Sequence, residues 1–341
     1  MSGFINNYKW TIRPLQVYGE AMYLVLLAAA LLVGTLLAVQ ASVNLQLNRA
    51  VGTPYGASTL QLTVAAVLLA VLAAATGSLG ALQGLPDVTW WHLLGGLASP
   101  LYITSGILLI PRLGALTTVG LWVTGQMLAS LVLDLGGLIG VRQVPLNLLI
   151  VLGAALVLVG ISVIVRSINQ SVKAGPGTAI AADTRPALST QLGWIVLGVV
   201  AGGVLPVQGA VNAKLRAELH APLTVATISF VVAVIAIALV LAVLVATKRT
   251  PKPKLGPLRD MPWWGWLGGA CAATYVTVTF LLIPEIGAAT TVAFTVAGQQ
   301  LASVVIDQRG LFRLPTRPLT VARLVGVVLL LVGSVLVQVA K

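Results

Sequence analysis

The sequence predicts an all-α integral membrane protein with ten transmembrane helices, arranged as two inverted five-helix repeats. Three observations predict this fold class. Only 8% of the 341 residues are charged and 58% are hydrophobic, whereas a soluble domain carries about 25% charged residues. The apolar runs are about 18–25 residues long, which suits membrane-crossing helices rather than strands. The second half of the chain also repeats the first, and each copy holds five such runs.

The elements follow one another in a simple order. Residues 1–20 are mixed polar and aromatic, and this segment is expected to lie at the membrane interface. A signal peptide is the alternative, but the following apolar run is longer than the usual h-region of about 7–15 residues. The stretch 167–189 is polar and contains Gly and Pro, which is typical of a linker. The predicted domains are therefore 1–20, 21–166, 167–189 and 190–341, and the predicted spans are 22–47, 57–79, 90–110, 115–135, 146–165, 192–215, 222–246, 262–283, 288–306 and 319–339.

Three pairs of segments carry the internal repeat. VQASVNLQL at 39–47 recurs as VQGAVNAKL at 207–215. LLIPRLGALTTV at 108–119 recurs at 281–292 as LLIPEIGAATTV, and GQMLASLVLD at 125–134 recurs at 298–307 as GQQLASVVID, with the same shift along the chain for both. Because each copy has an odd number of spans, the second copy would enter the membrane from the opposite side. Inverted repeats are typical of secondary transporters, which bind substrate near the midplane and alternate access.

Basic residues predict the orientation of the chain. One predicted face collects 14 of the 20 Lys and Arg residues, and the other collects 6. Since Lys and Arg concentrate in cytoplasmic loops, the first face is predicted to be cytoplasmic and both termini extracytoplasmic. Arg112 and Glu285 hold equivalent turns with opposite charge, which fits turns on opposite sides of the membrane. The net charge of +12 is thus assigned to topology and not to nucleic-acid binding.

No catalytic constellation can be found in the sequence. His92 and His220 lie at the edges of spans, and no Cys, His and Asp cluster has the spacing of metal ligands. No Gly-rich phosphate loop with its Lys is present, which argues against an ATP-driven pump. The single Cys271 permits no internal disulfide. The sequence therefore favours a protein that is not an enzyme and carries no cofactor or metal.

Polar side chains inside the spans are the candidates for substrate binding. At about 1.5 Å per residue, Gln126 lies about 13 Å into its span, near the midplane of a hydrocarbon core of about 30 Å. Gln299 occupies the matching place in the other copy, and the Gln–Asn pairs of the first and sixth spans would flank the centre. The alternative is that the amides only join helices, through bonds that average about 0.6 kcal/mol. The predicted substrate-binding residues are Gln40, Asn44, Gln126, Gln208, Asn212, Gln299, Tyr102 and Tyr275.

Two repeated carboxylates are the candidates for proton coupling. Asp134 and Asp307 end their spans, so depth counting places them at the interface rather than at the midplane. A carboxylate there avoids the cost of about 2.5–3.5 kcal/mol for a charge at the helix centre. Helix-end capping, or pairing with Arg142 and Arg309, is the simpler interpretation and is favoured.

The repeated motifs resemble a known family. The Q-x-x-x-N pattern that ends the first span of each half, with ALTTV or AATTV and then GQ-x-LAS-x-x-x-D, resembles the YdcZ-like family of the drug/metabolite transporter superfamily. The chain looks like a fused form with two homologous domains of opposite orientation. The resemblance implies a ten-helix bundle whose first four helices in each half surround the pathway. It also implies an inner (plasma) membrane location and an export or exchange role. Glu20 lies at a span edge, so the essential first-helix glutamate of small multidrug exporters has no counterpart here.

The sequence therefore predicts a secondary transporter, an exporter or exchanger of a small organic metabolite or drug. Neutral amides suit a neutral, zwitterionic or weakly charged solute better than a dication. The expected partners are the lipid bilayer, the solute and a coupling proton or ion, with no nucleic acid. The chain is expected to function as a monomer that contains a pseudo-dimer. Two alternatives stay open: a non-transporting scaffold or accessory subunit, and a lipid flippase or scramblase with a lateral polar groove.

Overall fold

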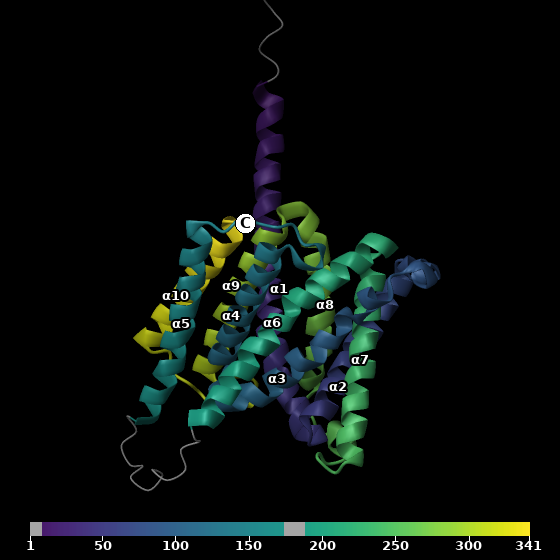
Figure 1. The fold of residues 1–341 in the computed structure, drawn as a ribbon, viewed down its shortest axis with the longest axis vertical. Helices are drawn as coiled ribbons and strands as arrows, with labels where there is room; N and C mark the ends of the chain where they lie inside the picture. The colour runs from purple at the N-terminus through teal and green to yellow at the C-terminus, as the bar shows by residue number, and fades with distance from the viewer. Residues whose placement is uncertain (1–8, 174–187) are drawn as a thin grey trace, which may run out of the picture.

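The structure is a computed structural model that describes residues 9–173 and 188–341, with side chains for 19–167 and 192–341. In this part of the chain, long α-helices form a bundle and no strand occurs (Figure 1). The short 3₁₀ helices η2 (Trp90–Leu97) and η5 (Trp263–Trp266) lead into the third and eighth α-helices. The α-helices are α1 (Lys9–Val51), α2 (Pro54–Ala75), α3 (Ala98–Leu113), α4 (Ala115–Gly136), α5 (Leu148–Lys173), α6 (Leu188–Leu219), α7 (Pro222–Ala246), α8 (Leu267–Ile286), α9 (Ala288–Arg309) and α10 (Val321–Val339).

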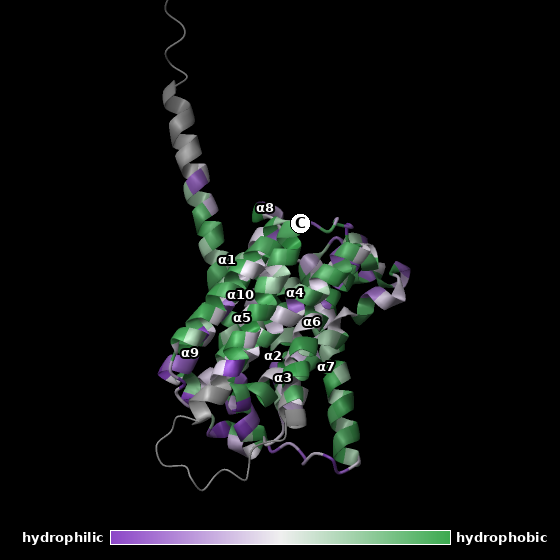
Figure 2. Cartoon of the chain, turned by 60° about the vertical axis from the view of Figure 1, so that its left-hand side comes forward, coloured by the Kyte–Doolittle hydropathy of each residue, from purple (hydrophilic) through white to green (hydrophobic). Residues whose placement is uncertain are grey.

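The ten predicted spans are confirmed. Ten helical segments of the described chain are long and apolar enough to cross a membrane. Hydrophobic residues cover most of the length of these helices, and hydrophilic residues gather toward the ends of the bundle (Figure 2). Large apolar side chains such as Leu148, Leu239 and Val332 are exposed on the outside. An exposed apolar surface of this kind suits contact with lipid tails, because helices satisfy their own backbone hydrogen bonds.

Two helices extend beyond their predicted spans. α1 begins at Lys9, so the predicted interfacial segment 1–20 is in large part continuous with the first span, and residues 1–8 lie outside the described chain. α5 continues to Lys173 and α6 begins at Leu188, so the predicted linker 167–189 is helical at both ends. Its centre, 174–187, lies outside the described residues. Adding a residue to an existing helix is far easier than starting one, which lets helices extend past their apolar spans.

The sequence explains where several helices begin and end. Pro54 and Pro222 stand in the first turns of α2 and α7, where the missing N–H has no helical partner to lose. Gly114 and Gly287 separate α3 from α4 and α8 from α9 with φ of 84° and 81°. Because L side chains rarely adopt such a φ, these glycines permit the abrupt reversal between paired helices.

The two halves pack through equivalent contacts. α1 packs on α8 and α9, while α6 packs on α3 and α4; α5 packs on α10, and α2 on α7. Gly34 of α1 lies against the backbone of Thr295, and Gly202 of α6 lies against the backbone of Trp122. When the repeated motifs are aligned, Gly34 matches Gly202 and Trp122 matches Thr295. The first helix of each half therefore packs on the fourth helix of the other half through an equivalent glycine contact. The opposite orientation of the two halves in the membrane stays a prediction.

Candidate functional site

A cavity of about 510 Å³ lies among α4, α6, α8 and α9, with contributions from α1 and the end of α10. It is partly open, and its lining reaches Asp134, Ala288 and Lys341, at the end of the bundle where the C-terminus is marked in Figure 1. Both halves supply its walls, and most of its surface is apolar, from side chains such as Leu37, Leu205 and Val296. Its polar lining residues are Gln126, Ser130, Asp134, Tyr275, Thr295, Gln299, Gln338 and Lys341.

The two predicted mid-depth glutamines both line this cavity, but they differ in hydrogen bonding. Gln299 is 1% exposed, and its Nε2 donates to the Tyr102 hydroxyl at 3.2 Å. The Nε2 of Gln126 is buried and has no hydrogen-bond partner among the described residues. Leaving a buried polar group unpaired costs about 1–3 kcal/mol. Gln126 therefore has an unpaired amide donor, and its contact with a substrate stays a prediction.

The two predicted tyrosines are equivalent in the two repeats but lie differently with respect to the cavity. Tyr275 is a lining residue, whereas Tyr102 is not. Tyr102 is 4% exposed and packs on the ring of Trp122 with 4.3 Å between centroids. Its hydroxyl accepts the hydrogen bond from Gln299, so Tyr102 orients that amide from behind rather than facing the cavity itself.

The Gln–Asn pair of the second half lies outside the cavity lining. Gln208 Nε2 donates to Ser99 Oγ at 2.9 Å and to Ser229 Oγ at 3.2 Å. Asn212 Nδ2 donates to the same Ser229 Oγ at 3.2 Å. The Asn212 side chain lies against Gly95 of η2. In this conformation the pair connects α6 to α7 and to the start of the third span.

Gln40 and Asn44 hold the equivalent place in the first half. Both are buried, at 3% and 1% exposed, and neither is a lining residue of the cavity. Asn44 lies against Gly268 of α8, whose carbonyl accepts from Gln61 Nε2 at 3.2 Å. Gln40 Oε1 and both side-chain polar atoms of Asn44 have no partner among the described residues. Substrate contact by these four residues stays a prediction.

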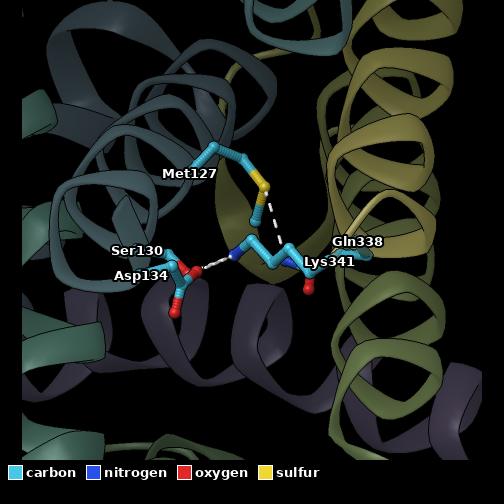
Figure 3. A network of polar contacts seen from close by, with 5 residues as sticks. All are labelled: Met127, Ser130, Asp134, Gln338 and Lys341. Carbon is cyan, nitrogen blue, oxygen red and sulfur yellow. Dashed lines mark hydrogen bonds and ion pairs between the residues drawn. The ribbon is translucent and has the colours of Figure 1, made fainter. Parts of the chain in front are cut away.

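Asp134 lies at the open end of the cavity and is paired. Its Oδ2 is 2.5 Å from Lys341 Nζ and accepts from Ser130 Oγ at 3.2 Å. Lys341 Nζ also donates to Ser130 Oγ at 2.6 Å. Figure 3 shows this network beside the contact between Gln338 and Met127. The ion pair ties the end of α4 to the residues that follow α10.

Asp307, its counterpart in the second half, lies at the opposite end of the bundle, beside the start of α4. The residue is 3% exposed. Its Oδ1 accepts from the Ala115 backbone N–H at 2.8 Å, and its Oδ2 accepts from the Leu116 backbone N–H at 3.1 Å. A carboxylate at a helix N-terminus satisfies backbone donors that have no helical partner and faces the positive end of the helix dipole. Asp307 therefore caps α4.

The ion pairs that the sequence predicted for these carboxylates are wrong. In the described chain, Asp134 pairs with Lys341 rather than with Arg142, because the segment after α10 crosses the end of α4. The positive charges that act on Asp307 come from Arg317 and Arg323 and not from Arg309. Helix capping does occur at Asp307, but at the start of a neighbouring helix instead of the end of its own.

A comparison with protein families identifies the chain. A family model described as "Putative inner membrane exporter, YdcZ" matches residues 25–163 and 193–336. The chain belongs to the YdcZ family. Its two matched regions fall in the two halves of the chain, as the sequence resemblance implied. The family description and the ten apolar helices make this YdcZ-family protein an inner-membrane transporter rather than an enzyme. A search of curated proteins finds no match.

The sequence did not reveal every polar residue of the YdcZ-family cavity. Ser130 stands four residues after Gln126 and four before Asp134, so helix periodicity alone places the three on one face. That signal was available. In the sequence, Lys341 contributes only to the distribution of positive charge that predicts orientation. Nothing in the sequence shows that it reaches Asp134, which lies in the other half of the chain.

Proposed function

We propose that this YdcZ-family protein is a secondary transporter that exports or exchanges a small organic solute by alternating access between inverted repeats. One observation carries the proposal: both halves build a partly open cavity at one end of the bundle, while at the other end Asp307 of one half holds the start of α4 in the other half. The equivalent contacts of Gly34 and Gly202 support a pathway between two interlocked repeats. A rigid scaffold would need neither the cavity nor the difference between its ends.

The lining favours a neutral, zwitterionic or weakly charged solute. Its volume of about 510 Å³ falls within the range of about 300–1,000 Å³ for small-molecule sites. Lys341 already neutralises the carboxylate of Asp134, so none of the described side chains that line the cavity offers an unpaired negative charge for a dication. Gln126 supplies an unpaired donor among apolar walls, which suits a largely apolar solute with at least one hydrogen-bond acceptor.

Thermal stability of the purified protein tests this function. Neutral and zwitterionic metabolites and drugs would be screened for a rise in Tm, because a ligand present at 100 times its Kd stabilises the folded state by about 2.7 kcal/mol. We expect stabilising compounds whose effect is lost in Gln126→Leu. The matched control is Gln143→Leu, since Gln143 is exposed and lies outside the cavity lining. Stabilisation that is equal in wild type and Gln126→Leu would place the binding site elsewhere.

The predicted orientation of the chain also predicts which side of the membrane the cavity faces. If both termini are extracytoplasmic, the cavity in this structure faces outward, since it opens where Lys341 lies. A protease-cleavable tag placed after Lys341 is then expected to be cut in intact cells. A tag inserted at Lys252, in the basic loop, should be cut only after the membrane is permeabilised. Protection of the tag after Lys341 together with cutting at Lys252 would reverse the orientation.

A further inference from the structure

Asp134 and Asp307 hold equivalent positions in the two repeats, yet they make different contacts. Asp307 caps α4 through the N–H groups of Ala115 and Leu116. The equivalent start of α9, at Ala288 and Ala289, is not capped by Asp134. Both alanines instead line the cavity, and Asp134 is held by Lys341 and Ser130.

We propose that Asp134 and Asp307 are alternating latches of the transport pathway. Each latch closes one end by capping the fourth helix of the other half, and it releases that helix when the end opens. This inference rests on the proposed transport function and adds the residues that hold each end shut. The structure has the Asp307 latch closed and the Asp134 latch released.

The residues next to the latches differ in the same sense. Val119, one turn inside the α4 cap, is fully buried, while its counterpart Val292 lines the cavity. At mid-depth, Tyr102 lies behind the cavity wall and accepts a hydrogen bond from Gln299, whereas its counterpart Tyr275 lines the cavity. Equivalent residues of the two halves thus differ in burial from the latch to mid-depth. Such a difference is expected if two equivalent halves have closed one end of the pathway and opened the other.

The closed latch has a reinforcement that the released latch lacks. Arg317 N donates to the Asp307 carbonyl at 2.6 Å, and the guanidinium of Arg317 donates to the carbonyls of Pro111 at 3.3 Å and Arg112 at 3.2 Å. The residue equivalent to Arg317 is Val144, whose N–H donates to the Asp134 carbonyl at 2.9 Å but whose side chain offers no donor. This difference, with the Lys341 pair, explains which of the two ends is closed.

Cysteine labelling in purified protein tests the latches without any substrate. In a Cys271→Ala background, Val119→Cys and Val292→Cys are matched probes of the two ends. We expect a small maleimide to react quickly at 292 and slowly at 119. Lys341→Ala frees Asp134 to cap α9, so labelling at 292 should fall and labelling at 119 should rise. Each change should be at least about tenfold, since hydrogen bonds to charged groups contribute about 1.5–3 kcal/mol and about 1.4 kcal/mol is a factor of ten.

Further variants separate a latch from a merely structural carboxylate. Asp307→Asn should shift labelling in the same direction as Lys341→Ala, and Asp134→Asn should cancel the effect of Lys341→Ala. If Asp307→Asn yields no folded protein, labelling at 119 and 292 in Lys341→Ala, with and without Asp134→Asn, decides whether the latches exist. Unchanged labelling in Lys341→Ala, or a parallel rise at both probes, overturns the proposal. Because labelling needs no transport, a protein that shows the shift but transports nothing overturns only the proposed function.

Discussion

Replacing Gly202 by valine is expected to destabilise the folded protein strongly. A Cβ at this position would overlap the backbone of Trp122 on α4, and backbone cannot move aside as a flexible side chain does. Forcing packed segments apart costs about 1–3 kcal/mol and sometimes more, out of a total stability of about 5–15 kcal/mol. The measurement is the yield of monodisperse protein in detergent and its Tm, which should fall by many degrees if any protein survives.

The same helix offers a matched control for this steric effect. A Cβ at Gly193 would have no atom within 4 Å, so Gly193→Val should leave yield and Tm unchanged. Gly34→Val should be as harmful as Gly202→Val, because Gly34 meets the backbone of Thr295 in the equivalent contact. Equal stability of Gly202→Val and Gly193→Val would mean that α6 and α4 do not approach as closely as the structure has them.

Hydropathy predicted the ten spans because burial in lipid imposes a length and an apolar composition on each helix. Their ends were less predictable. α1 already begins at Lys9, before its apolar span, and α5 continues to Lys173, after its apolar span. Burial in lipid does not require a helix in either of these flanking segments. The repeat also predicted that the halves would correspond, and Gly34 and Gly202 make equivalent contacts.

The sequence gives the position of a residue along its helix, but it does not give rotation about the helix axis. Counting residues placed Gln126 and Gln299 at mid-depth, and both line the cavity. Gln40 and Asn44 on α1 lie outside the lining, and Asn44 faces Gly268 of α8. On an all-apolar helix no amphipathic pattern indicates which face meets a cavity, since lipid and protein interior are equally apolar.

Long-range pairing was the other limit of the sequence. Asp134 and Asp307 are repeated, which made them candidates, but their partners come from distant segments. Lys341 meets Asp134, and the backbone of Ala115 meets Asp307. A backbone N–H is present in nearly every residue, so no residue pattern could have predicted the cap on α4.

The double replacement Gln126→Leu with Gln299→Leu is expected to abolish transport while the protein remains folded. Leucine matches glutamine in size but cannot donate, so the cavity loses both mid-depth amides, one of which has an unpaired Nε2. Transport would be measured in proteoliposomes, with a compound that raises the Tm of the wild-type protein. Gln143→Leu, outside the cavity, should transport normally.

The single variants should differ, because the two amides have different surroundings. Tyr102→Phe removes only the acceptor of the Gln299 hydrogen bond, and a neutral hydrogen bond is worth about 0.5–1.5 kcal/mol, so transport should fall by about tenfold or less. Gln126→Leu removes a donor that has no protein partner and should raise Tm slightly while it lowers transport. If the amides served only packing, Gln299→Leu would still lower Tm through its lost hydrogen bond, but Gln126→Leu would leave transport unchanged. Opposite changes of stability and transport at Gln126 therefore distinguish a binding residue from a packing residue.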